Sequence, residues 1–591
     1  MLRTHTCNEL GINNIGEKVT LTGWMDTVRD HGGVLFVDLR DHYGVTQIVL
    51  SDDSLIAGIA KETVILVEGV VSKRDEETVN PKIATGLIEV KAEKVEVLGP
   101  CQLGLPFEID TSTQTREEVR LKYRYLDLRN RKIHDNIVLR SKILSYLRSQ
   151  MEDLGFLEIQ TPILTASSPE GARDYLVPSR KHKGKFYALP QAPQQFKQLL
   201  MASGFDRYFQ IAPCFRDEDA RQDRSPGEFY QLDFEMSFAT QEDVFEVAET
   251  VVYNTFTKFS DKKVSKPPFK RITFADAMLK YGTDKPDLRN PLEIKDLTDF
   301  FARHEFLDIN GRTVPFKNKL VRGIVANYLV KKDGEGDGKK AFEKAIDTYS
   351  RSIGMKFGCG YITLEGDDFK GPIAKFLTDE QKKELCELCG VKEGDSIFFI
   401  SDSASVIDRL SGEMRTWIGN ELGLIKDDSF EFCFIVDFPM YELNAETGRI
   451  DFTHNPFSMP QGGMDALLNK DPLEIFAYQY DIVCNGVELS SGAVRNHNPE
   501  IMRKAFEIAG YGEEDLKAKF GALYTAFAYG APPHAGMAPG VDRMIMLIAG
   551  EETIRDVIAF PLNGNAQDLM MGAPGEVTEQ QLREVHIKVR D

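Results

Sequence analysis

Short runs of alternating apolar and polar residues fill the N-terminal part of the chain. Turn signals such as Gly32-Gly33 and Asn80-Pro81 separate them. Alternation with a period of two predicts half-buried strands, and five short strands within about 80 residues suit an OB-type barrel. The predicted strands are Lys18–Met25, Val34–Leu39, Val45–Leu50, Val64–Val71 and Leu87–Leu98.

Two aromatic side chains are predicted on otherwise polar faces of this barrel. Trp24 shares its face with Asp26, and Phe36 lies on the polar side of the next strand, with Arg29 and Gln47 close in sequence. Exposed aromatic rings stack unpaired bases in single-stranded RNA. The alternative is that Trp24 and Phe36 cover a second domain.

A second alternating pattern follows Arg216 after a charged loop. Gln231, Asp233 and Glu235 share one face, and the apolar residues between Tyr230 and Met236 share the other. This pattern predicts two antiparallel strands with a polar floor and an apolar underside. An arginine at the base of such a hairpin can clamp a phosphate or a carboxylate. A surface hairpin with ion pairs is the alternative.

A hairpin is also predicted around Asn485-Gly486, because Asn-Gly between two strand-like runs favours a two-residue turn. Such a turn places Val483 opposite Glu488 and Asp481 opposite Ser490. Asp481 and Glu488 then share a face as diagonal neighbours. Two carboxylates within reach of one point suit a hard cation such as Mg²⁺.

Two further segments have helical patterns. Gly536–Arg543 predicts a glycine- and proline-containing turn that opens an apolar helix with an arginine in its first turn. A helix N-terminus favours anions, although such an arginine can equally form a structural ion pair. Apolar residues at helical spacing from Ile137 to Leu154 predict a second helix, which Gly155 ends and the strand Phe156–Pro162 follows.

Taken together, these segments resemble the three motifs of the class II aminoacyl-tRNA synthetases. The helix and strand Ile137–Pro162 resemble the first motif, and Phe215-Arg216-Asp217-Glu218 resembles the second. Gly536, Gly540 and Arg543 match the third. The sequence His-Ile-Gly-His, which the other synthetase class needs, does not occur in the chain.

The aspartate members of this family are especially similar in the segments Gln191–Met201, Ser168–Tyr175 and His454–Phe457. The resemblance implies an α+β multidomain fold with an N-terminal OB β-barrel, an antiparallel-sheet catalytic core and an inserted α/β domain. It implies ATP-dependent attachment of L-aspartate to tRNA(Asp) through aspartyl-adenylate. An asparagine–tRNA ligase and a non-catalytic tRNA-binding paralogue are the alternatives.

Site residues follow from the same resemblance, position by position. Residues implied to hold L-aspartate are Glu170, Gln194, Lys197, Arg216, Asp233, His454 and Arg495. Residues implied to hold ATP are Arg216, Asp217, Glu218, Ser225, Glu488, Gly540, Val541, Asp542 and Arg543, with Mg²⁺ on Asp481 and Glu488. Among these, the catalytic residues are Arg216, Glu488 and Arg543.

The tRNA contacts implied for the barrel are Arg29, His31, Phe36, Gln47 and Glu77. His31 resembles relatives that charge both tRNA(Asp) and tRNA(Asn). Those relatives often have glycine near the position of Glu77, so charging of tRNA(Asn) stays open. A homodimer is implied by the first motif.

Length and charge add limits to this picture. A chain of 591 residues is too long for a single core, and the net charge of -20 argues against non-specific binding of nucleic acid. An excess of basic residues in 116–148 could bind one folded RNA or form a solvated helical face. No apolar run approaches the ~18 residues that a membrane span needs, so we expect a cytoplasmic location and no membrane partner.

We predict six segments along the chain. They are an OB-fold anticodon-binding domain (1–107), a hinge (108–135), the first part of the catalytic core (136–288), an inserted bacterial-type domain (289–427), the second part of the core (428–560) and a C-terminal extension (561–591).

Overall fold

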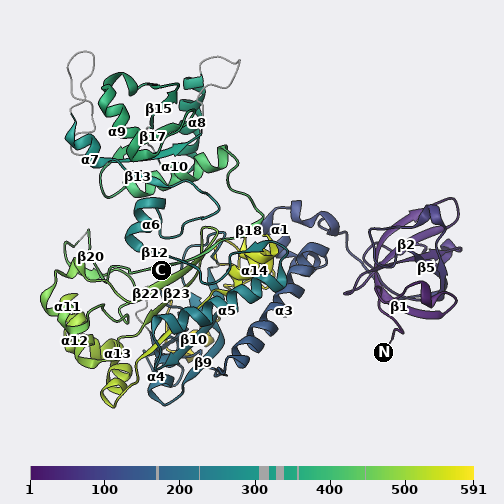
Figure 1. Ribbon diagram of the computed structural model, residues 1–591. Coiled ribbons are helices and arrows are strands. Elements are labelled where there is room, and N and C mark those ends of the chain that lie inside the picture. The colour runs from purple at the N-terminus through teal and green to yellow at the C-terminus, as the bar shows by residue number, and fades with distance from the viewer. Residues whose placement is uncertain are drawn as a thin grey trace. The chain divides into compact units, whose positions relative to one another are not determined.

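The computed structural model describes residues 2–167, 172–224, 226–304, 319–327, 338–355, 359–445 and 447–590. Contacts between residues divide the chain into two compact units, Met1–Glu108 and Ile109–Asp591, coloured from purple to yellow in Figure 1. Within the described ranges, no helix combines the length and the apolar character that crossing a membrane requires. The finer division into six segments remains a prediction.

The N-terminal unit is a closed five-stranded barrel, as the alternation predicts. The strand order is β1-β2-β3-β5-β4. The strands are β1 (Lys18–Asp30), β2 (Leu35–Arg40), β3 (Val45–Leu50), β4 (Val64–Lys73) and β5 (Ile88–Gly99). Inward-facing aliphatic side chains such as Leu21, Val37 and Ile48 form its core. The alternation predicted for β1 is wrong at Asp26, because a bulge between Met25 and Thr27 buries Asp26 as well as Met25.

The larger unit is built around an eight-stranded sheet whose central strands are all antiparallel. Its order is β12-β19-β22-β23-β24-β10-β9-β6, and only the outermost pairs at each end are parallel. The strands are β6 (Leu157–Glu158), β9 (Arg207–Arg216), β10 (Gly227–Ser237), β12 (Lys270–Thr273), β19 (Phe432–Val436), β22 (Gln479–Cys484), β23 (Val487–Val494) and β24 (His534–Met537). The structure thus confirms the predicted hairpin around Arg216, in which Arg216 pairs with Gly227.

Three helices cover the apolar face of this sheet (Figure 1). They are α3 (Arg131–Asp153), α5 (Gln241–Phe259) and α14 (Val541–Ala549). Local signals define their ends: Asn130 caps the start of α3, and Gly155 follows its end with φ 81°. Leu232 and Phe234 of β10 point into the core that these helices complete, so the alternate residues of β10 face the other side.

Further helices pack on the polar side of the sheet. Helix α4 (Gln194–Ala202) lies against β10 and β9, and α13 lies against α4. The other helices of this group are α11 (Gly463–Asn469), α12 (Pro499–Ile508) and α13 (Glu513–Ala528). Their shared core includes Phe506, Leu516 and Phe520. These helices therefore cover part of the polar face of the sheet. That face carries the residues described below.

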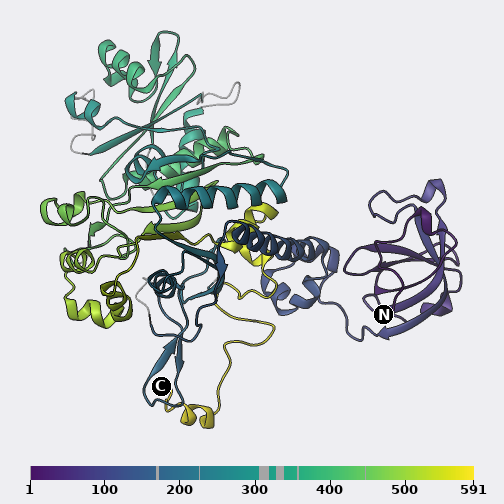
Figure 2. The same ribbon diagram turned by 60° about the horizontal axis from the view of Figure 1, so that its bottom comes forward.

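Small elements connect these parts. They are α1 (Glu117–Lys122), α2 (Arg124–Asp127), α6 (Phe274–Tyr281), α15 (Glu579–Glu584) and the two-stranded pairs β7 (Leu176–Pro178) with β8 (Phe186–Ala188), β11 (Lys263–Val264) with β18 (Ser429–Phe430), and β20 (Tyr441–Leu443) with β21 (Ile450–Phe452). Beyond the core, the C-terminal segment runs as an extended chain that ends with α15 (Figure 2).

The segment between α6 and β18 forms its own five-stranded sheet, of order β13-β14-β17-β15-β16. Its strands are β13 (Ile294–Asp296), β14 (Leu320–Ala326), β15 (Gly360–Glu365), β16 (Asp368–Lys370) and β17 (Ser396–Asp402). Its helices are α7 (Thr298–Arg303), α8 (Gly338–Ser352), α9 (Asp379–Cys389) and α10 (Ile407–Glu421). Two apolar clusters pack against this sheet, which matches the inserted α/β domain that we expected.

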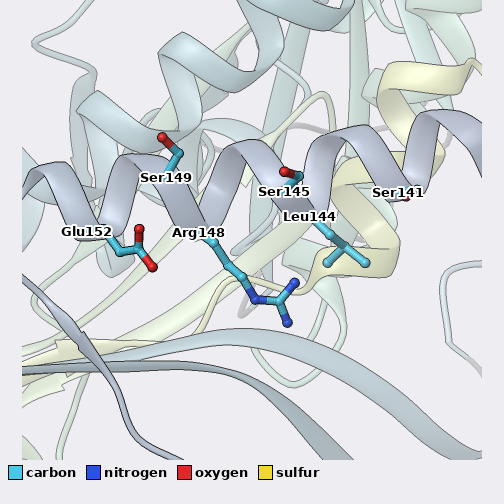
Figure 3. A pocket seen from close by; sticks show the side chains of 6 residues that line it. All are labelled: Ser141, Leu144, Ser145, Arg148, Ser149 and Glu152. Atoms are coloured by element: carbon cyan, nitrogen blue, oxygen red, sulfur yellow. The ribbon is translucent and has the colours of Figure 1, made fainter.

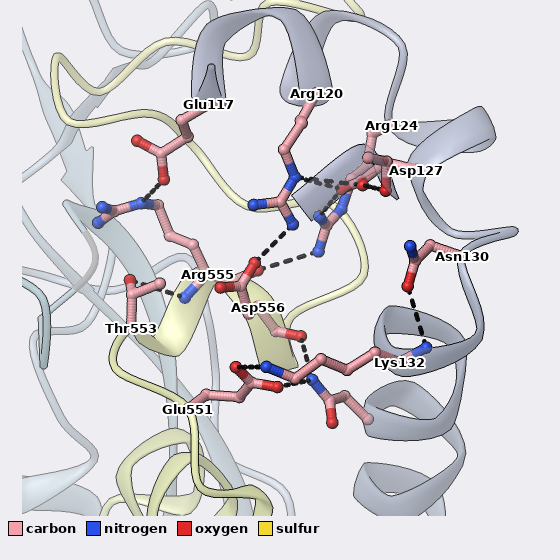
Figure 4. Close-up of polar contacts among 12 residues, drawn as sticks. Glu117, Arg120, Arg124, Asp127, Asn130, Lys132, Glu551, Thr553, Arg555 and Asp556 are labelled. Atoms are coloured by element: carbon pink, nitrogen blue, oxygen red, sulfur yellow. Dashed lines mark hydrogen bonds and ion pairs between the residues drawn. The ribbon is translucent and has the colours of Figure 1, made fainter. Parts of the chain in front are cut away.

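The basic segment 116–148 is largely engaged in ion pairs within the unit. Arg120 and Arg124 both bind Asp127, and Arg120 also reaches Asp556 (Figure 4). Further along the same segment, Lys132 pairs with Glu551 at 2.7 Å. These contacts favour the interpretation of the segment as a structural connection over that of an RNA-binding seam.

Two further local predictions are wrong. Asp481 pairs with Ser491 rather than Ser490, because an extra residue, Leu489, forms a bulge between Glu488 and Ser490. Leu489 is buried in the core, and its carbonyl accepts a hydrogen bond from the Gly540 amide. The strand predicted over residues 156–162 is also shorter, since only β6 is paired.

Candidate active site

Four charged side chains form a buried cluster on the polar face of the sheet. Lys197 on α4 donates a hydrogen bond from Nζ to Oδ1 of Asp233 on β10 (2.6 Å). Arg495, directly after β23, donates from Nε and Nη2 to the two carboxylate oxygens of Glu235 (2.8 and 3.1 Å). Lys197 also lies 3.5 Å from Glu235. The cluster therefore holds two cations side by side, each oriented by a carboxylate.

Burial makes this arrangement electrostatically strong. All four side chains have at most 2% of their surface exposed. Burial alone would raise the pKa of Glu235, but Arg495 and Lys197 hold it below its ordinary value. Gly536 on β24 makes room for the carboxylate, because a Cβ there would lie 2.2 Å from Oε2 of Glu235. Removing one partner would leave a buried, uncompensated charge.

Neutral polar groups surround the cluster. The fully buried His534 on β24 contacts the Pro532 carbonyl through Nδ1 (2.8 Å) and Oε1 of Gln198 through Nε2 (3.2 Å). Gln198 in turn donates to the carbonyl of Gln194. Within the described part of the chain, the buried amide nitrogen of Gln194 has no hydrogen-bond partner, which leaves a donor for a ligand.

Arg216 lies at the end of β9. The loop that follows, between β9 and β10, is called the motif-2 loop. Its guanidinium lies 5.0 Å from the centre of the Phe229 ring, and its buried Nε has no hydrogen-bond partner among the residues that the structure describes. Glu218 pairs with Arg224 at 2.7 Å across the loop. The amide of Asp217 donates to a backbone carbonyl of the segment before β7. Arg216 is thus held by stacking, with donors left for an anion.

Glu488 on β23 lies among several cations. Nζ of Lys285 lies 3.0 Å from its Oε2, and Arg543 donates from Nη1 to the Glu488 backbone carbonyl (2.6 Å). Arg543 also contacts Asp223 of the motif-2 loop (3.3 Å). Burial would raise the pKa of Glu488, but Lys285, Arg543 and then Arg216 lower it. The segments around β9, β23 and α14 therefore meet at one carboxylate.

Asp481 on β22 faces the same point. Burial raises its pKa well above the ordinary value, and the nearby Glu488 carboxylate adds to the shift. Its buried Oδ1 has no hydrogen-bond partner among the described residues. Two carboxylates of this kind, one of them with an unsatisfied oxygen, are donors that fit Mg²⁺.

The remaining residues of the third motif have structural contacts. Asp542 accepts hydrogen bonds from Arg140 on α3 (2.5 Å) and from the amide of Tyr230 (2.9 Å). Gly540 precedes α14, and Val541 is fully buried. The Asp542 side chain thus links α14 to α3 and β10, and it supports the next residue, Arg543.

His454 lies in the loop after β21, near enough to Glu488 and Lys285 to interact with them electrostatically. Its ring packs edge-on against Phe438, with ring centres 5.3 Å apart, and burial lowers its pKa. Two other predicted residues, Glu170 and Ser225, lie outside the described residues.

In the N-terminal unit, two of the predicted tRNA contacts, Arg29 and Gln47, belong to a hydrogen-bonded group on the barrel face. Arg29 donates two hydrogen bonds to Asp38 (2.7 and 2.8 Å) and a third to Gln47 (3.3 Å). Gln47 also donates to Glu89 on the neighbouring β5 (3.0 Å). The antiparallel register of β1, β2 and β3 brings these residues together.

Aromatic side chains lie beside this group. Phe36 and His31 meet edge to face, with ring centres 5.3 Å apart. Arg40 lies 6.0 Å from the Trp24 ring. Glu77 is exposed in a separate turn, the 3-10 helix Glu76–Thr78. The face around Phe36 combines a ring with hydrogen-bonding groups, which suits an unpaired base.

Three functional side chains were not predicted as site residues. Glu235 shares the face of Asp233, so the alternation of β10 offered a signal for it. His534 shows no signal in the sequence, because a single buried histidine is usually a core residue. Lys285 comes from a loop some two hundred residues before Glu488, and only the folded chain brings the two together.

Comparison with known proteins agrees with these features. The family model of tRNA synthetases class II (D, K and N) matches residues 116–564, and that of the OB-fold nucleic acid binding domain matches residues 19–98. A curated protein of Rickettsia canadensis, called aspartate–tRNA(Asp/Asn) ligase, is 54% identical over 595 residues, covering 99% of this chain and 97% of its own length. A protein of the same name from Anaplasma phagocytophilum is also 54% identical, with the same coverage.

Solved structures show a similar fold at low identity. The asparaginyl-tRNA synthetase of Pyrococcus horikoshii in complex with asparaginyl-adenylate gives a TM-score of 0.57 at 18% identity, covering 95% of this chain and 98% of its own. The aspartyl-tRNA synthetase of Entamoeba histolytica gives 0.56 at 19%, covering 95% and 91%. At these identities the likeness concerns the fold alone.

Proposed function

The chain belongs to the class II tRNA synthetases of the D, K and N group, and we propose that it attaches L-aspartate to tRNA in an ATP-dependent reaction. The observation that carries the proposal is the buried pair of cations, Lys197 and Arg495, each oriented by its own carboxylate. The side-chain carboxylate of aspartate can contact both cations there. The amide of asparagine has only one acceptor oxygen, and its NH2 group would turn a donor towards one of the two cations, which disfavours the asparagine ligase.

Two reactions follow each other at this site. In the first, an oxygen of the α-carboxylate of aspartate attacks the α-phosphorus of ATP, and diphosphate leaves. In the second, a terminal hydroxyl of tRNA attacks the carbonyl carbon of aspartyl-adenylate, and AMP leaves. Positioning and charge neutralisation account for such in-line displacement, so no protein nucleophile is required.

Each group of residues has a role in this scheme. Glu170 and the amide oxygen of Gln194 would accept hydrogen bonds from the substrate ammonium group, and the unsatisfied amide N–H of Gln194 would donate to a substrate oxygen. His454 would close over the substrate. Arg216 would bridge the α-carboxylate and the α-phosphate. The ATP residues would be Asp217, Glu218, Ser225, Glu488, Gly540, Val541, Asp542 and Arg543. Asp481 and Glu488 would hold Mg²⁺, which neutralises phosphate charge when bound.

The contacts of Asp542 narrow its part in ATP binding. Both of its carboxylate oxygens already accept hydrogen bonds inside the protein. We therefore propose that it acts through the backbone and by holding the turn before α14, while Arg543 contacts the nucleotide directly. A non-catalytic paralogue is disfavoured, since Arg216, Glu488 and Arg543 are all present and close together.

For the RNA, we propose that both tRNA(Asp) and tRNA(Asn) are charged. Relatives at 54% identity carry that double specificity in their names, and the ring pair of His31 and Phe36 offers a stacking surface for an anticodon base. Arg29, Gln47 and Glu77 would complete the contacts. Since tRNA charging supplies ribosomes, we place the reaction in the cytoplasm.

Charging of separate tRNA(Asp) and tRNA(Asn) transcripts with labelled aspartate, ATP and Mg²⁺ tests the proposal. We expect aspartate on both. Charging of tRNA(Asp) alone would remove the double specificity and keep the ligase. Charging of neither transcript, with no aspartate-dependent exchange of diphosphate into ATP, would overturn the catalytic proposal.

We also propose that two copies of the chain form a homodimer along α3 and β6. The residues Ser141, Leu144, Ser145, Arg148 and Ser149 line a shallow depression on α3 (Figure 3). The adjoining edge strand β6 has no further strand partner among the described residues, and Leu157 on it is 56% exposed. Ile163 and Leu164 nearby are exposed as well. Sedimentation equilibrium of the full chain would show twice the chain mass if this is right.

A further inference from the structure

Lys285 belongs to none of the three motifs, yet it reaches the ATP site that we propose. It lies in the loop between α6 and β13, and its Nζ lies 3.0 Å from Oε2 of Glu488. A lysine side chain is a cation at neutral pH, and this one forms an ion pair with the Glu488 carboxylate.

Three cations surround Glu488 and belong to three different segments. Arg543 contacts both the backbone carbonyl and, at 4.0 Å, the carboxylate of Glu488, while Arg216 acts on it electrostatically. We propose above that both arginines bind ATP. Lys285 approaches the carboxylate more closely than Arg543 does, and its side chain is 41% exposed, so its ammonium group has room to contact a ligand.

We propose that Lys285 is a third phosphate-binding cation of this site, contacting a phosphate oxygen of ATP and of the diphosphate that leaves. This inference rests on the proposed function and deepens it. A lysine ammonium suits a phosphate as a compact charge with three donors. Without a ligand, Glu488 holds the ammonium group at the place where phosphate charge would arrive.

The inserted domain holds the loop that carries Lys285. Arg415 on α10, only 2% exposed, donates hydrogen bonds to the carbonyls of Asp287 (3.0 Å), Asn290 (2.6 Å) and Leu292 (2.6 Å). Asn290 donates back to the Arg415 carbonyl (2.9 Å). One guanidinium thus fixes three points of the loop.

The loop packs tightly against α10 at its start and lies beside the β22–β23 turn. Gly282, at its start, has φ 70°, and a Cβ there would lie 2.3 Å from the Asp408 carbonyl oxygen of α10. On the opposite side, a Cβ on Gly486 in the β22–β23 turn would lie 3.6 Å from Cβ of Asp287 and 3.9 Å from the Lys285 carbonyl oxygen. The loop therefore lies between α10 and the turn next to Glu488, and Arg415 is a positioning residue for Lys285.

Equilibrium binding to the full chain tests the role of Lys285. Calorimetric titrations with ATP in the presence of Mg²⁺, with diphosphate and with aspartate would compare the unmodified chain with Lys285→Met. We expect ATP and diphosphate to bind roughly 10- to 100-fold more weakly, as for the loss of a charged hydrogen bond, and aspartate to bind with unchanged affinity. Lys504→Met, which removes a lysine paired with Glu507 elsewhere in the unit, is the matched control.

A double-mutant cycle tests the role of the inserted domain. Arg415→Lys keeps the charge and loses the forked donor, so we expect ATP to bind roughly 3- to 10-fold more weakly, through misplacement of the loop. In a chain that already carries K285M, the same change should cause no further loss. A merely structural role of Arg415 would lower the melting temperature and weaken ATP binding equally in both backgrounds.

Two results would overturn the inference. One is ATP affinity that K285M leaves unchanged, and the other is an equal loss of ATP and aspartate affinity, which would indicate general damage. Failure of the proposed function looks different, since the unmodified chain would then show no aspartate-dependent exchange of diphosphate into ATP. The ATP titrations would still test in that case whether Lys285 binds phosphate.

Discussion

At the scale of single residues, the buried cluster on the polar face of the sheet combines two matched ion pairs with neutral polar neighbours. Lys197 and Asp233 form one pair, and Arg495 and Glu235 form the other. Each buried charge therefore has an internal partner, which avoids the larger penalty of an unpaired buried ion. The added charge of a substrate carboxylate must then be offset by polar groups around it, and His534 is a titratable group among them.

The pH dependence of stability should report on His534. Burial lowers its pKa from 6.5 to about 4, and the Glu235 carboxylate offsets only part of this shift, while Arg495 and His497 favour the neutral ring. The unfolded chain binds a proton below pH 6.5, whereas the folded chain does so only near pH 4. Neutral burial of His534 therefore costs stability progressively as the pH falls from 6.5 to 4, by about 3 kcal/mol in all.

His534→Gln removes this titration and keeps a hydrogen-bonding group. Urea unfolding at pH 7.5, 5.5 and 4.5 would measure the free energy of unfolding of both chains. We expect the unmodified chain to be the more stable at pH 7.5 and the difference to shrink by about 3 kcal/mol towards pH 4. His182→Gln, at an exposed position, should leave the pH profile unaltered. A constant difference between the H534Q and unmodified chains at all three pH values would contradict the argument.

At the scale of elements, the site depends on how closely β10, β23 and β24 approach each other. Gly492 on β23 pairs with Met537 on β24, the neighbour of Gly536, and a Cβ on Gly492 would lie 2.5 Å from the Gly536 carbonyl oxygen. Neither residue has a side chain that could fill this space. The two glycines let three strands bring Glu235 and Arg495 into contact.

Gly536→Ala should therefore disturb the cluster from a neighbouring strand. The new Cβ would lie 2.2 Å from both Oε2 of Glu235 and the Phe234 carbonyl oxygen, so β10 and β24 would have to separate. We expect a melting temperature several degrees lower and a raised KM for aspartate. Gly521→Ala in α13, where nothing lies within 4 Å of the added Cβ, should instead stabilise by up to about 1 kcal/mol. Equal effects of both changes would sink the idea.

The elements also show how far a single sequence could predict this fold. The five barrel strands and the hairpin around Arg216 follow from alternation, and the resemblance implies both Lys197 and Asp233 as site residues, which the structure pairs. The bulge at Leu489 could not be predicted, because it depends on the Gly540 amide some fifty residues later. Lys285 escaped prediction for the same reason, since Arg415 and α10 position it through tertiary contacts.

At the scale of the whole molecule, an acidic protein has to recognise an RNA. The net charge is -20, and several basic side chains of 116–148 are already paired, as with Arg120 and Lys132 (Figure 4). A broad electrostatic attraction is therefore weak. Recognition then depends on local contacts such as base stacking. We propose that the barrel face around Phe36 provides them, in a unit separate from the proposed catalytic residues.

Phe36→Ala separates recognition of tRNA from activation of aspartate. Loss of one stacked base costs roughly 1–3 kcal/mol, so kcat/KM for tRNA should fall by roughly 5- to 150-fold. Aspartate-dependent exchange of diphosphate into ATP should stay unchanged, because its residues lie in the other unit. Tyr43→Ala removes another aromatic ring of the same barrel, 49% exposed and outside the proposed face, and should leave charging intact. If F36A charges tRNA normally, the barrel must read the RNA through another face, and the roles proposed for Arg29, His31 and Gln47 would fail together.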